Sequence, residues 1–393
     1  MRILIAETPQ YIAFHGQAIF TINLAEGLAK SGHEVLALVG SERGRAYSSR
    51  RNGVQIEALS ALNLKIFHPD AFLPLFSARA VQLAIQVFQP DIVHIQDHYP
   101  LCRNAVIFAH RLGIKTVGTN HFMPENLAPY VPVLSKIKPV FNWVLWQWMS
   151  DTYNRLNAIV TPSRTAARMV RSAGLWPPIL PISCGVNTDL FHPIPAVDRR
   201  AWRTRYGIDP DKIVFFFVGR VDKEKRLDVL LRALHLTKRA DIQVVIAGKG
   251  AASKRLNALA RKLELGQKVC FTGFLPNEDL PSVLNSIDVF TMPSEAELLS
   301  IATLQAMACG RPVLAADAVA LPELVTENVN GLLFHPGNVE DAARCMEWFA
   351  NHPERWLGMG KASLEKVQAH RLTNIISQYE TLYEKLLAGA PLE

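Results

Sequence analysis

The most informative stretch of the sequence is Met292-Pro-Ser-Glu-Ala-Glu-Leu-Leu-Ser-Ile-Ala-Thr-Leu-Gln-Ala-Met-Ala-Cys-Gly-Arg-Pro-Val313. Ser300 is a favoured N-cap residue, and an apolar run follows it from Ile301 until Gly310 stops the helix. The first backbone N–H groups of such a helix lie at the positive end of its dipole. We therefore expect the turn at Ser300 and Ile301 to bind an anion such as phosphate, with Glu297 beside it to hold hydroxyl groups.

Short apolar runs alternate with amphipathic helical patterns on both sides of this stretch. The alternation predicts strands joined by crossover helices, as in a parallel doubly wound sheet. It is interrupted by the Pro-rich stretch Pro177–Pro195 and the basic segment Asp198–Tyr206, and then restarts, which predicts an α/β chain of two domains. The expected strands are Ile3–Ala6, Glu34–Val39, Ile92–Ile95, Lys115–Gly118 and Ala158–Thr161 in the first half, and Ile213–Val218, Gln243–Ala247, Val269–Thr272, Val289–Met292, Pro312–Ala315 and Gly331–Phe334 in the second.

A second group of charged residues follows the expected strand Ile213–Val218. Gly219 lets the backbone approach a ligand, and Arg220 and Lys225 carry positive charge that would neutralise a departing diphosphate. The plainer alternative is a solvated charged loop that opens a helix.

These two segments together resemble the retaining GT-B glycosyltransferases of family 4. Glu297 matches the first glutamate of that family's Glu-x7-Glu signature, and Gln305 stands where the second is expected. The resemblance implies that Glu297 lies against the donor sugar and that Gln305 faces the ribose of the nucleotide. An amide at Gln305 would pair with ribose less strongly than a carboxylate. Leu298 is a further departure, because a glycine usually follows the first glutamate.

The basic segment carries the same resemblance. Arg220 and Lys225 match the family's G-R-x-x-x-x-K pair, whereas Arg226 replaces the glycine that often follows the lysine. With this match we favour a functional interpretation of the two cations over a solvated loop.

The resemblance also implies how the chain is divided and what it does. We expect two Rossmann-like domains that face a cleft, an acceptor-side domain at 1–190 and a donor domain at 191–369, with a C-terminal helix at about 370–393 crossing back to the first domain. The implied reaction is retaining transfer of a hexose from a nucleoside diphosphate sugar, with UDP-glucose as the first candidate, to a hydroxyl of a lipid or saccharide. The alternatives are a GDP-mannose-dependent mannosyltransferase, a nucleotide-sugar-binding protein without catalysis, and a phosphorylase or epimerase of the same fold. Within the family, the sequence is similar to diacylglycerol glucosyltransferases.

Two further glycine turns are expected at the carboxyl ends of strands, where ligands of open α/β sheets bind. In the resembling family the turn after Val269–Thr272 contacts the base, which assigns that role to Phe274 and Leu275. Gly16 stands after the first strand, where the family has a glycine-rich loop close to the donor phosphate. Each of these turns is open to the alternative that it only reverses the chain.

Three polar residues follow strands of the first half. His121 comes after Lys115–Gly118, and the resemblance places such a histidine near the donor sugar, where a neutral imidazole could bind a hydroxyl. The alternative is a histidine satisfied by neighbouring backbone. Asp97 and His98 end the preceding strand and are candidates for the acceptor side.

The sequence indicates no metal or cofactor. The only Asp-x-Asp spacing that resembles a metal motif, Asp209-Pro-Asp211, precedes a strand and is typical of a turn. The cations Arg220 and Lys225 could do the charge work of a metal ion. The nucleotide sugar is then a co-substrate.

Charge and composition narrow the partners. A net charge of +7 would suit nucleic acid, but no zinc-finger, RNA-recognition or basic-helix pattern is present, so we do not expect nucleic-acid binding. The strand Ile3–Ala6 opens the sequence without a leader pattern, and five scattered cysteines fit a reducing compartment, so we expect a cytoplasmic location.

One segment of the expected acceptor domain is unusually aromatic. Residues 134–149 hold Trp143, Trp146 and Trp148, with Lys136 and Lys138 nearby, and the segment is too short to span a bilayer. It is open to two interpretations, a helix lying in the headgroups on the inner face of the membrane or a helix packed in the core.

Overall fold

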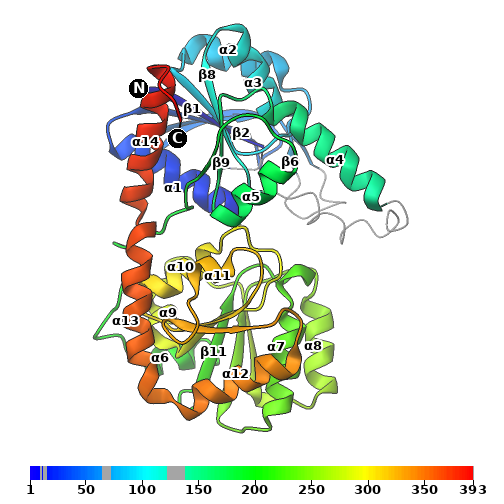
Figure 1. The fold of residues 1–393 in the computed structure, drawn as a ribbon, viewed down its shortest axis with the longest axis vertical. Coiled ribbons are helices and arrows are strands. Elements are labelled where there is room, and N and C mark those ends of the chain that lie inside the picture. The colour runs from blue at the N-terminus through cyan, green and yellow to red at the C-terminus, as the bar shows by residue number, and fades with distance from the viewer. Residues whose placement is uncertain (9–10, 12–15, 64–71, 122–137, 393) are drawn as a thin grey trace. The chain divides into compact units, whose positions relative to one another are not determined.

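The computed structural model describes residues 1–8, 11, 16–63, 72–121 and 138–392 (Figure 1). The chain forms two compact units, one of Met1–Cys184 with Leu372–Glu393 and the other of Gly185–Arg371. Residues 134–137 of the aromatic segment lie outside the described part. All five cysteines are free thiols.

The first unit is built on an eight-stranded sheet with the order β10-β9-β8-β7-β1-β2-β4-β3. All neighbouring strands are parallel except β3, which is antiparallel to β4. The chain moves outward from β1 to one side and then returns to place β7 on the other side, so the strand order reverses between β1 and β7. The strands are β1 (Arg2–Glu7), β2 (Glu34–Gly40), β3 (Tyr47–Arg51), β4 (Val54–Leu59), β7 (Ile92–Ile95), β8 (Lys115–Thr119), β9 (Ala158–Thr161) and β10 (Ile179–Pro181), with a separate short pair β5 (Leu62–Asn63) and β6 (Phe72–Leu73).

Helices cover this sheet, and the C-terminal helix is one of them. They are α1 (Gly16–Lys30), α2 (Ala78–Phe88), α3 (Pro100–Arg111), α4 (Lys138–Tyr153), α5 (Arg164–Ser172) and α14 (Leu372–Leu387). The close packing of α14 on α1 leaves no room for a Cβ at Gly27, which would lie 2.6 Å from Ile376. Tyr383 of α14 hydrogen-bonds the buried His94 of β7 (2.7 Å), so the last helix completes the core of the first unit (Figure 1).

The second unit has a six-stranded, fully parallel sheet with the order β13-β12-β11-β14-β15-β16. Its strand order reverses between β11 and β14, because β12 and β13 lie on one side and β14 to β16 on the other. The strands are β11 (Ile213–Val218), β12 (Ile242–Ala247), β13 (Val269–Gly273), β14 (Val289–Met292), β15 (Val313–Ala316) and β16 (Gly331–Phe334). The predicted pair of doubly wound parallel sheets is thus confirmed.

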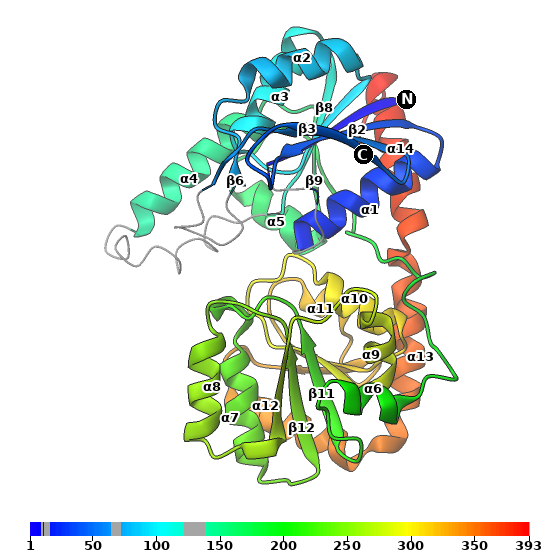
Figure 2. The ribbon, with the colours of Figure 1, turned by 180° about the vertical axis from the view of Figure 1, so that it is seen from behind.

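One helix of the second unit, α6 (Arg199–Arg205), precedes its first strand and the others follow strands, and Figure 2 shows several of them beside the sheet. The others are α7 (Leu227–Thr237), α8 (Ser253–Lys262), α9 (Leu280–Ser286), α10 (Ile301–Ala308), α11 (Leu321–Leu324), α12 (Val339–Asn351) and α13 (Trp356–Val367). The helical pattern expected over Ala362–Leu387 is divided between α13 and α14, with a short 3-10 turn at Gln368–His370 between them. The extended Arg371 (ψ 135°) breaks the helix there.

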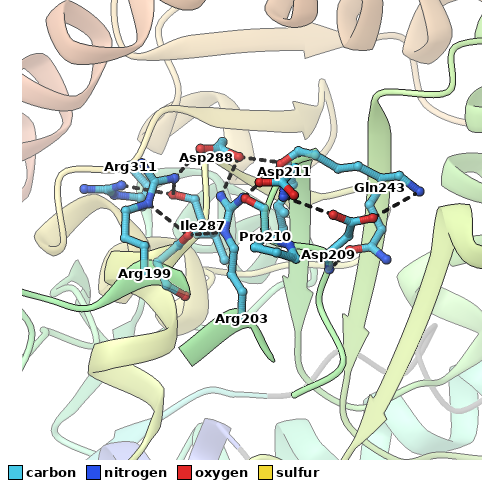
Figure 3. A network of polar contacts seen from close by, with 12 residues as sticks. Arg199, Arg203, Asp209, Pro210, Asp211, Gln243, Ile287, Asp288 and Arg311 are labelled. Atoms are coloured by element: carbon cyan, nitrogen blue, oxygen red, sulfur yellow. Dashed lines mark hydrogen bonds and ion pairs between the residues drawn. The ribbon is translucent and has the colours of Figure 1, made fainter. Parts of the chain in front are cut away.

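Arginine side chains bind the residues just before β14, and Figure 3 shows Arg199, Arg203 and Arg311 gathered around Asp288 and Ile287. Asp288, just before β14, accepts hydrogen bonds from Arg203 (2.7 Å), from Arg199 and from the backbone N–H of Val214 (2.9 Å). Arg311 donates to the carbonyl of Cys309, the C-cap of α10 (3.1 Å). Cations near C-terminal carbonyls satisfy them and oppose the negative end of the helix dipole. This network therefore fixes the strand and the helix that flank the Glu297 loop.

Candidate functional site

The candidate site lies in the second unit, at the carboxyl ends of β11 and β14. These are the two strands between which the strand order reverses, the position where ligands of open α/β sheets bind. The loop after β11 carries Arg220 and Lys225, and the loop after β14 carries Glu297. The fold thus brings the two charged segments of the sequence together.

Lys225 and Glu297 form an ion pair across these two loops. The Nζ of Lys225 lies 2.5 Å from Oε1 of Glu297, and the two side chains are only 17% and 11% exposed. Lys225 is the last residue of a short 3-10 helix, Lys223–Lys225, in the loop after β11. Because the pair is largely withdrawn from water, its charges are screened less than those of a surface pair.

Arg220 is held within its own loop. Its guanidinium contacts Asp222 (2.9 Å) and Glu224 (3.0 Å), and the side chain is 43% exposed. The two candidate cations of the site, Arg220 and Lys225, are therefore both paired with carboxylates in this structure. An anionic ligand would have to replace carboxylate partners at Arg220 and Lys225, and replacement at Lys225 would release Glu297.

The glycines after β11 and β12 serve close packing of backbone on backbone. Gly248 has a φ of +134°, and a Cβ there would lie 1.9 Å from the carbonyl oxygen of Gly219. The N–H of Gly248 donates to the carbonyl of Gly273 (2.6 Å), and that of Gly219 donates to Ala247 (3.1 Å). Gly219 therefore lies beside the site as expected, while Gly248 is required by the contact between loops.

The helix start at Ser300 has the predicted form. Ser300 is the N-cap of α10, and its Oγ accepts a hydrogen bond from the N–H of Thr303 (3.2 Å). Ile301 and Gln305 of this helix are partly exposed, whereas Leu298 in the loop before it is buried. Gln305 thus lies on a helix face with access to solvent, as a ligand-binding role requires.

The two candidate base-binding residues in the turn after β13 differ in exposure. Phe274 is 51% exposed and Leu275 only 6%, with Leu275 packed into the core of the unit. An exposed aromatic ring presents a planar apolar face on which a base can stack. Phe274 is therefore the side chain of this turn that could stack on a base.

In the first unit, Asp97 joins the loops that follow β1 and β7, the two strands between which the strand order reverses. Its carboxylate accepts from the N–H and the hydroxyl of Thr8, both at 2.7 Å, and from the N–H of Tyr99 (2.9 Å). His98 is buried and stacks on the ring of Tyr99 at 4.8 Å between centroids. Burial lowers the pKa of His98, which favours the neutral imidazole. These contacts give both residues a structural function, and their predicted acceptor role stays a prediction.

His121 is held beside the same edge of the first sheet. Its Nε2 lies 3.0 Å from Oε1 of the buried Gln96, and its ring lies 4.8 Å from that of Phe20 on α1. Since an amide oxygen only accepts, Nε2 of His121 is the donor in this contact. Gly16 is the exposed first residue of α1.

Glu7, at the end of β1, was not predicted as a special residue. Its side chain is fully buried, and among the residues that the structure describes neither carboxyl oxygen has a hydrogen-bond partner within normal geometry. Burial, followed by the nearby charge of Asp97, raises the pKa of Glu7 well above its usual range. Gln17 and Thr21 of α1 approach this carboxyl and oppose the shift. The signal available in the sequence was a carboxylate ending an otherwise apolar strand.

Within the described residues, no group of three or more His, Cys, Asp or Glu side chains is arranged to hold a metal ion.

Comparison with known proteins identifies the family. The family model Glycosyltransferase Family 4 matches residues 14–190, and Glycosyl transferases group 1 matches residues 198–365. The chain belongs to the family-4 glycosyltransferases. Its two Rossmann-like units are those of the GT-B fold.

Curated relatives of this glycosyltransferase family differ in their reactions. The sulfoquinovosyl transferase SQD2 of Arabidopsis thaliana is 28% identical over 297 residues, which are 72% of this chain and 54% of that protein. A D-inositol 3-phosphate glycosyltransferase of Mycobacterium sp. (strain KMS) is 33% identical over 65% of this chain and 58% of its own length. The chain thus spans little more than half the length of these two relatives. A GDP-mannose-dependent alpha-mannosyltransferase of Corynebacterium glutamicum is 25% identical over 96% of this chain and 88% of its own length.

Solved structures show the same fold. Sucrose-phosphate synthase from Thermosynechococcus elongatus aligns with a TM-score of 0.81 and 19% identity, covering 99% of this chain and 100% of that one. Anabaena HepE in complex with UDP-glucose aligns with a TM-score of 0.77 and 19% identity, covering 97% and 99%.

Proposed function

We propose that this protein is a retaining glycosyltransferase that moves a hexose from a nucleoside diphosphate sugar to a hydroxyl of a lipid or saccharide. The observation that carries the proposal is the Lys225–Glu297 pair at the β11/β14 reversal, with Arg220 in the same loop. A cation for the diphosphate and a carboxylate for the sugar lie within one hydrogen bond of each other. Membership of the glycosyltransferase family supports the reaction class.

The donor would enter by exchanging ion pairs. Its diphosphate binds Arg220 and Lys225 in place of Asp222, Glu224 and Glu297, which leaves the Glu297 carboxylate to accept hydrogen bonds from sugar hydroxyls. The first turn of α10, at Ser300 and Ile301, adds backbone N–H groups at the positive end of the helix. Phe274 stacks on the base, and the partly exposed Gln305 binds the ribose.

The chemical step is a substitution at the anomeric carbon of the donor sugar. The bond from the anomeric carbon to the phosphate oxygen breaks, and a bond forms to the acceptor oxygen on the same face of the sugar. The acceptor proton passes to the departing phosphate. The negative charge on the diphosphate increases as the bond breaks, and the positive charges on Arg220 and Lys225 stabilise it in the transition state. His121 contributes a hydrogen bond to a hydroxyl of the donor sugar.

We propose UDP-glucose as the donor. GDP-mannose is the second candidate, because the relative that names this donor aligns over most of both chains. Neither an added cofactor nor a metal ion is part of the proposal.

The acceptor side is proposed to meet a membrane through α4. The end of this helix is buried, with Met149 and Tyr153 each 1% exposed and Trp148 packed against His98 (5.2 Å between ring centroids). Trp143, one and a half turns earlier, is 61% exposed. The helix therefore has a core-packed end and, before it, one exposed tryptophan, which supports a contact with lipid at Trp143. No helix among those described is both long and apolar enough to cross a bilayer.

Product formation tests the function directly. The wild-type protein is incubated with UDP-glucose or GDP-mannose and with lipid and saccharide acceptors, and products are identified by mass spectrometry. We expect an acceptor-linked hexose whose formation is lost in Glu297→Ala. Nucleotide-sugar binding without hydrolysis or transfer would instead indicate a binding protein, and a product without an acceptor moiety would indicate a phosphorylase or epimerase.

A further inference from the structure

Arg226 occupies a backbone conformation that suits glycine. Its φ of 49° and ψ of 36° are left-handed, and it lies between the 3-10 turn of Lys225 and the first residue of α7. A residue with a Cβ is strained there, whereas glycine is not. Any role of residue 226 that glycine could not fill therefore lies in the contacts of the arginine side chain.

That side chain reaches the Glu297 loop. Nη1 of Arg226 lies 2.5 and 2.6 Å from the two carboxylate oxygens of Glu295. The two adjacent cations Lys225 and Arg226 thus pair with Glu297 and Glu295, so two ion pairs join the same two loops. The backbone supports this junction, because the carbonyl of Glu224 accepts from the N–H of Glu295 (3.3 Å).

The two ion pairs differ in what the proposed reaction asks of them. Donor binding takes Lys225 away from Glu297, which removes one of the links between the loops. Arg226 and Glu295 are each 32% exposed and are assigned no ligand, so their link can persist. The carbonyl of Glu297 is held separately by the N–H of Ala320 (3.2 Å).

We propose that Arg226 is a positioning residue. Through Glu295 it keeps the Glu297 loop in place while Lys225 exchanges its carboxylate partner for the donor diphosphate. This inference rests on the proposed function. It assigns to Arg226 a role that depends on the arginine side chain at a position where glycine would satisfy the backbone.

Arg226→Gly tests the role, because it removes the side chain and leaves a residue suited to the left-handed backbone. Lys238→Gly is the matched control. Lys238 is an exposed cation at the other end of α7 and is also left-handed, with a φ of 50°. Glu295→Gln tests the partner, and Asp241→Asn, which weakens the Arg239–Asp241 pair away from the site, is its control.

We expect Arg226→Gly and Glu295→Gln each to raise the KM for the donor on the order of tenfold or more, because a displaced catalytic loop is costly. The double variant should be no worse than either single variant, and Arg226→Lys should recover part of the loss. Hydrogen exchange in the peptide covering 294–300 should accelerate in both variants but in neither control.

Two results would overturn the inference. Donor KM and loop exchange in Arg226→Gly equal to those of Lys238→Gly, in an active protein, would show that Arg226 does not position the loop. A wild-type protein that neither binds nor turns over any nucleotide sugar would overturn the proposed function and this inference with it.

Discussion

Replacing Lys225 with methionine should separate the structural work of the Lys225–Glu297 pair from its proposed catalytic work. Methionine has a similar length and no charge, so Glu297 is left without its cation at 11% exposure. Breaking a fully buried pair costs about 3–5 kcal/mol, and breaking an exposed one about 0–1 kcal/mol. This pair lies between those limits, and we expect the second unit to lose about 2 kcal/mol of unfolding free energy.

The double variant Lys225→Met/Glu297→Gln removes both charges and provides the decisive comparison. Stability should return most of the way to wild type, because no uncompensated carboxylate remains. Activity should not return. Loss of a charge that stabilises the leaving group costs about 10²–10³ in kcat, and the second substitution removes a sugar contact as well.

Stability is measured by urea titration with hydrogen exchange of peptides from β11 and β14, and turnover by nucleotide release. Lys223→Met is the control, since Lys223 is exposed and belongs to the same short helix. Unchanged stability in Lys225→Met would show that the pair is not formed in solution. Near wild-type turnover would refute the assignment of Lys225 to the diphosphate.

Three further predictions concern two buried titratable side chains, His94 and Glu7, and the close backbone contact at Gly248. Burial lowers the pKa of His94 from 6.5 to about 3, so its neutral form stabilises the first unit and that stability is lost as pH falls below 6.5. Relative to His94→Gln, the unfolding free energy of the wild type in urea titrations should fall by about 2 kcal/mol between pH 6.5 and 5. A difference between the two proteins that stays constant with pH would contradict this. Burial raises the pKa of Glu7, so its contribution to stability is complete below the pKa of the unfolded state and is lost as pH rises. Relative to Glu7→Gln, the unfolding free energy of the wild type should fall above pH 4.5 by at most about 1.4 kcal/mol per pH unit. Parallel pH profiles of the two proteins would show that Glu7 is ionised without penalty. Gly248→Ala should lower the unfolding free energy of the second unit by about 3 kcal/mol, because the added Cβ meets the carbonyl of Gly219. The control Gly358→Ala, in helix α13 with open space around it, should be neutral or stabilising. Equal melting temperatures of the two variants would show that the loops around Gly248 relax.

The buried strands could be predicted because their signal is local. Ile92–Ile95, Ile213–Val218, Val289–Met292 and Gly331–Phe334 are formed over the expected residues, since each is an apolar run flanked by residues that end strands. The helix start at Ser300 and its end before Gly310 were equally local, set by an N-cap hydroxyl and a left-handed glycine.

The contacts of the candidate site depend on sheet order, which no local pattern contains. Lys225 and Glu297 are 72 residues apart in sequence and meet because β14 lies beside β11. The motif match named both residues but could not show that they pair. The same holds for His94, which hydrogen-bonds Tyr383 in a helix 289 residues later in the sequence.

Glycine patterns were the least informative signal. The sequence gives Gly248 and Gly219 similar surroundings after their strands, but the close approach that makes Gly248 necessary is a contact between two loops. Arg226 shows the converse, because its left-handed backbone cannot be inferred from an arginine in a charged segment.

The most direct test of the central claim is calorimetric titration of the wild-type protein with UDP, GDP, ADP and their hexose conjugates, in parallel with Lys225→Met and Lys223→Met. The account predicts that one nucleoside diphosphate binds selectively, that its hexose conjugate binds with it, and that affinity is lost in Lys225→Met but kept in Lys223→Met. Absence of binding by every nucleotide, or equal binding by both lysine variants, would contradict a donor site at the β11/β14 reversal.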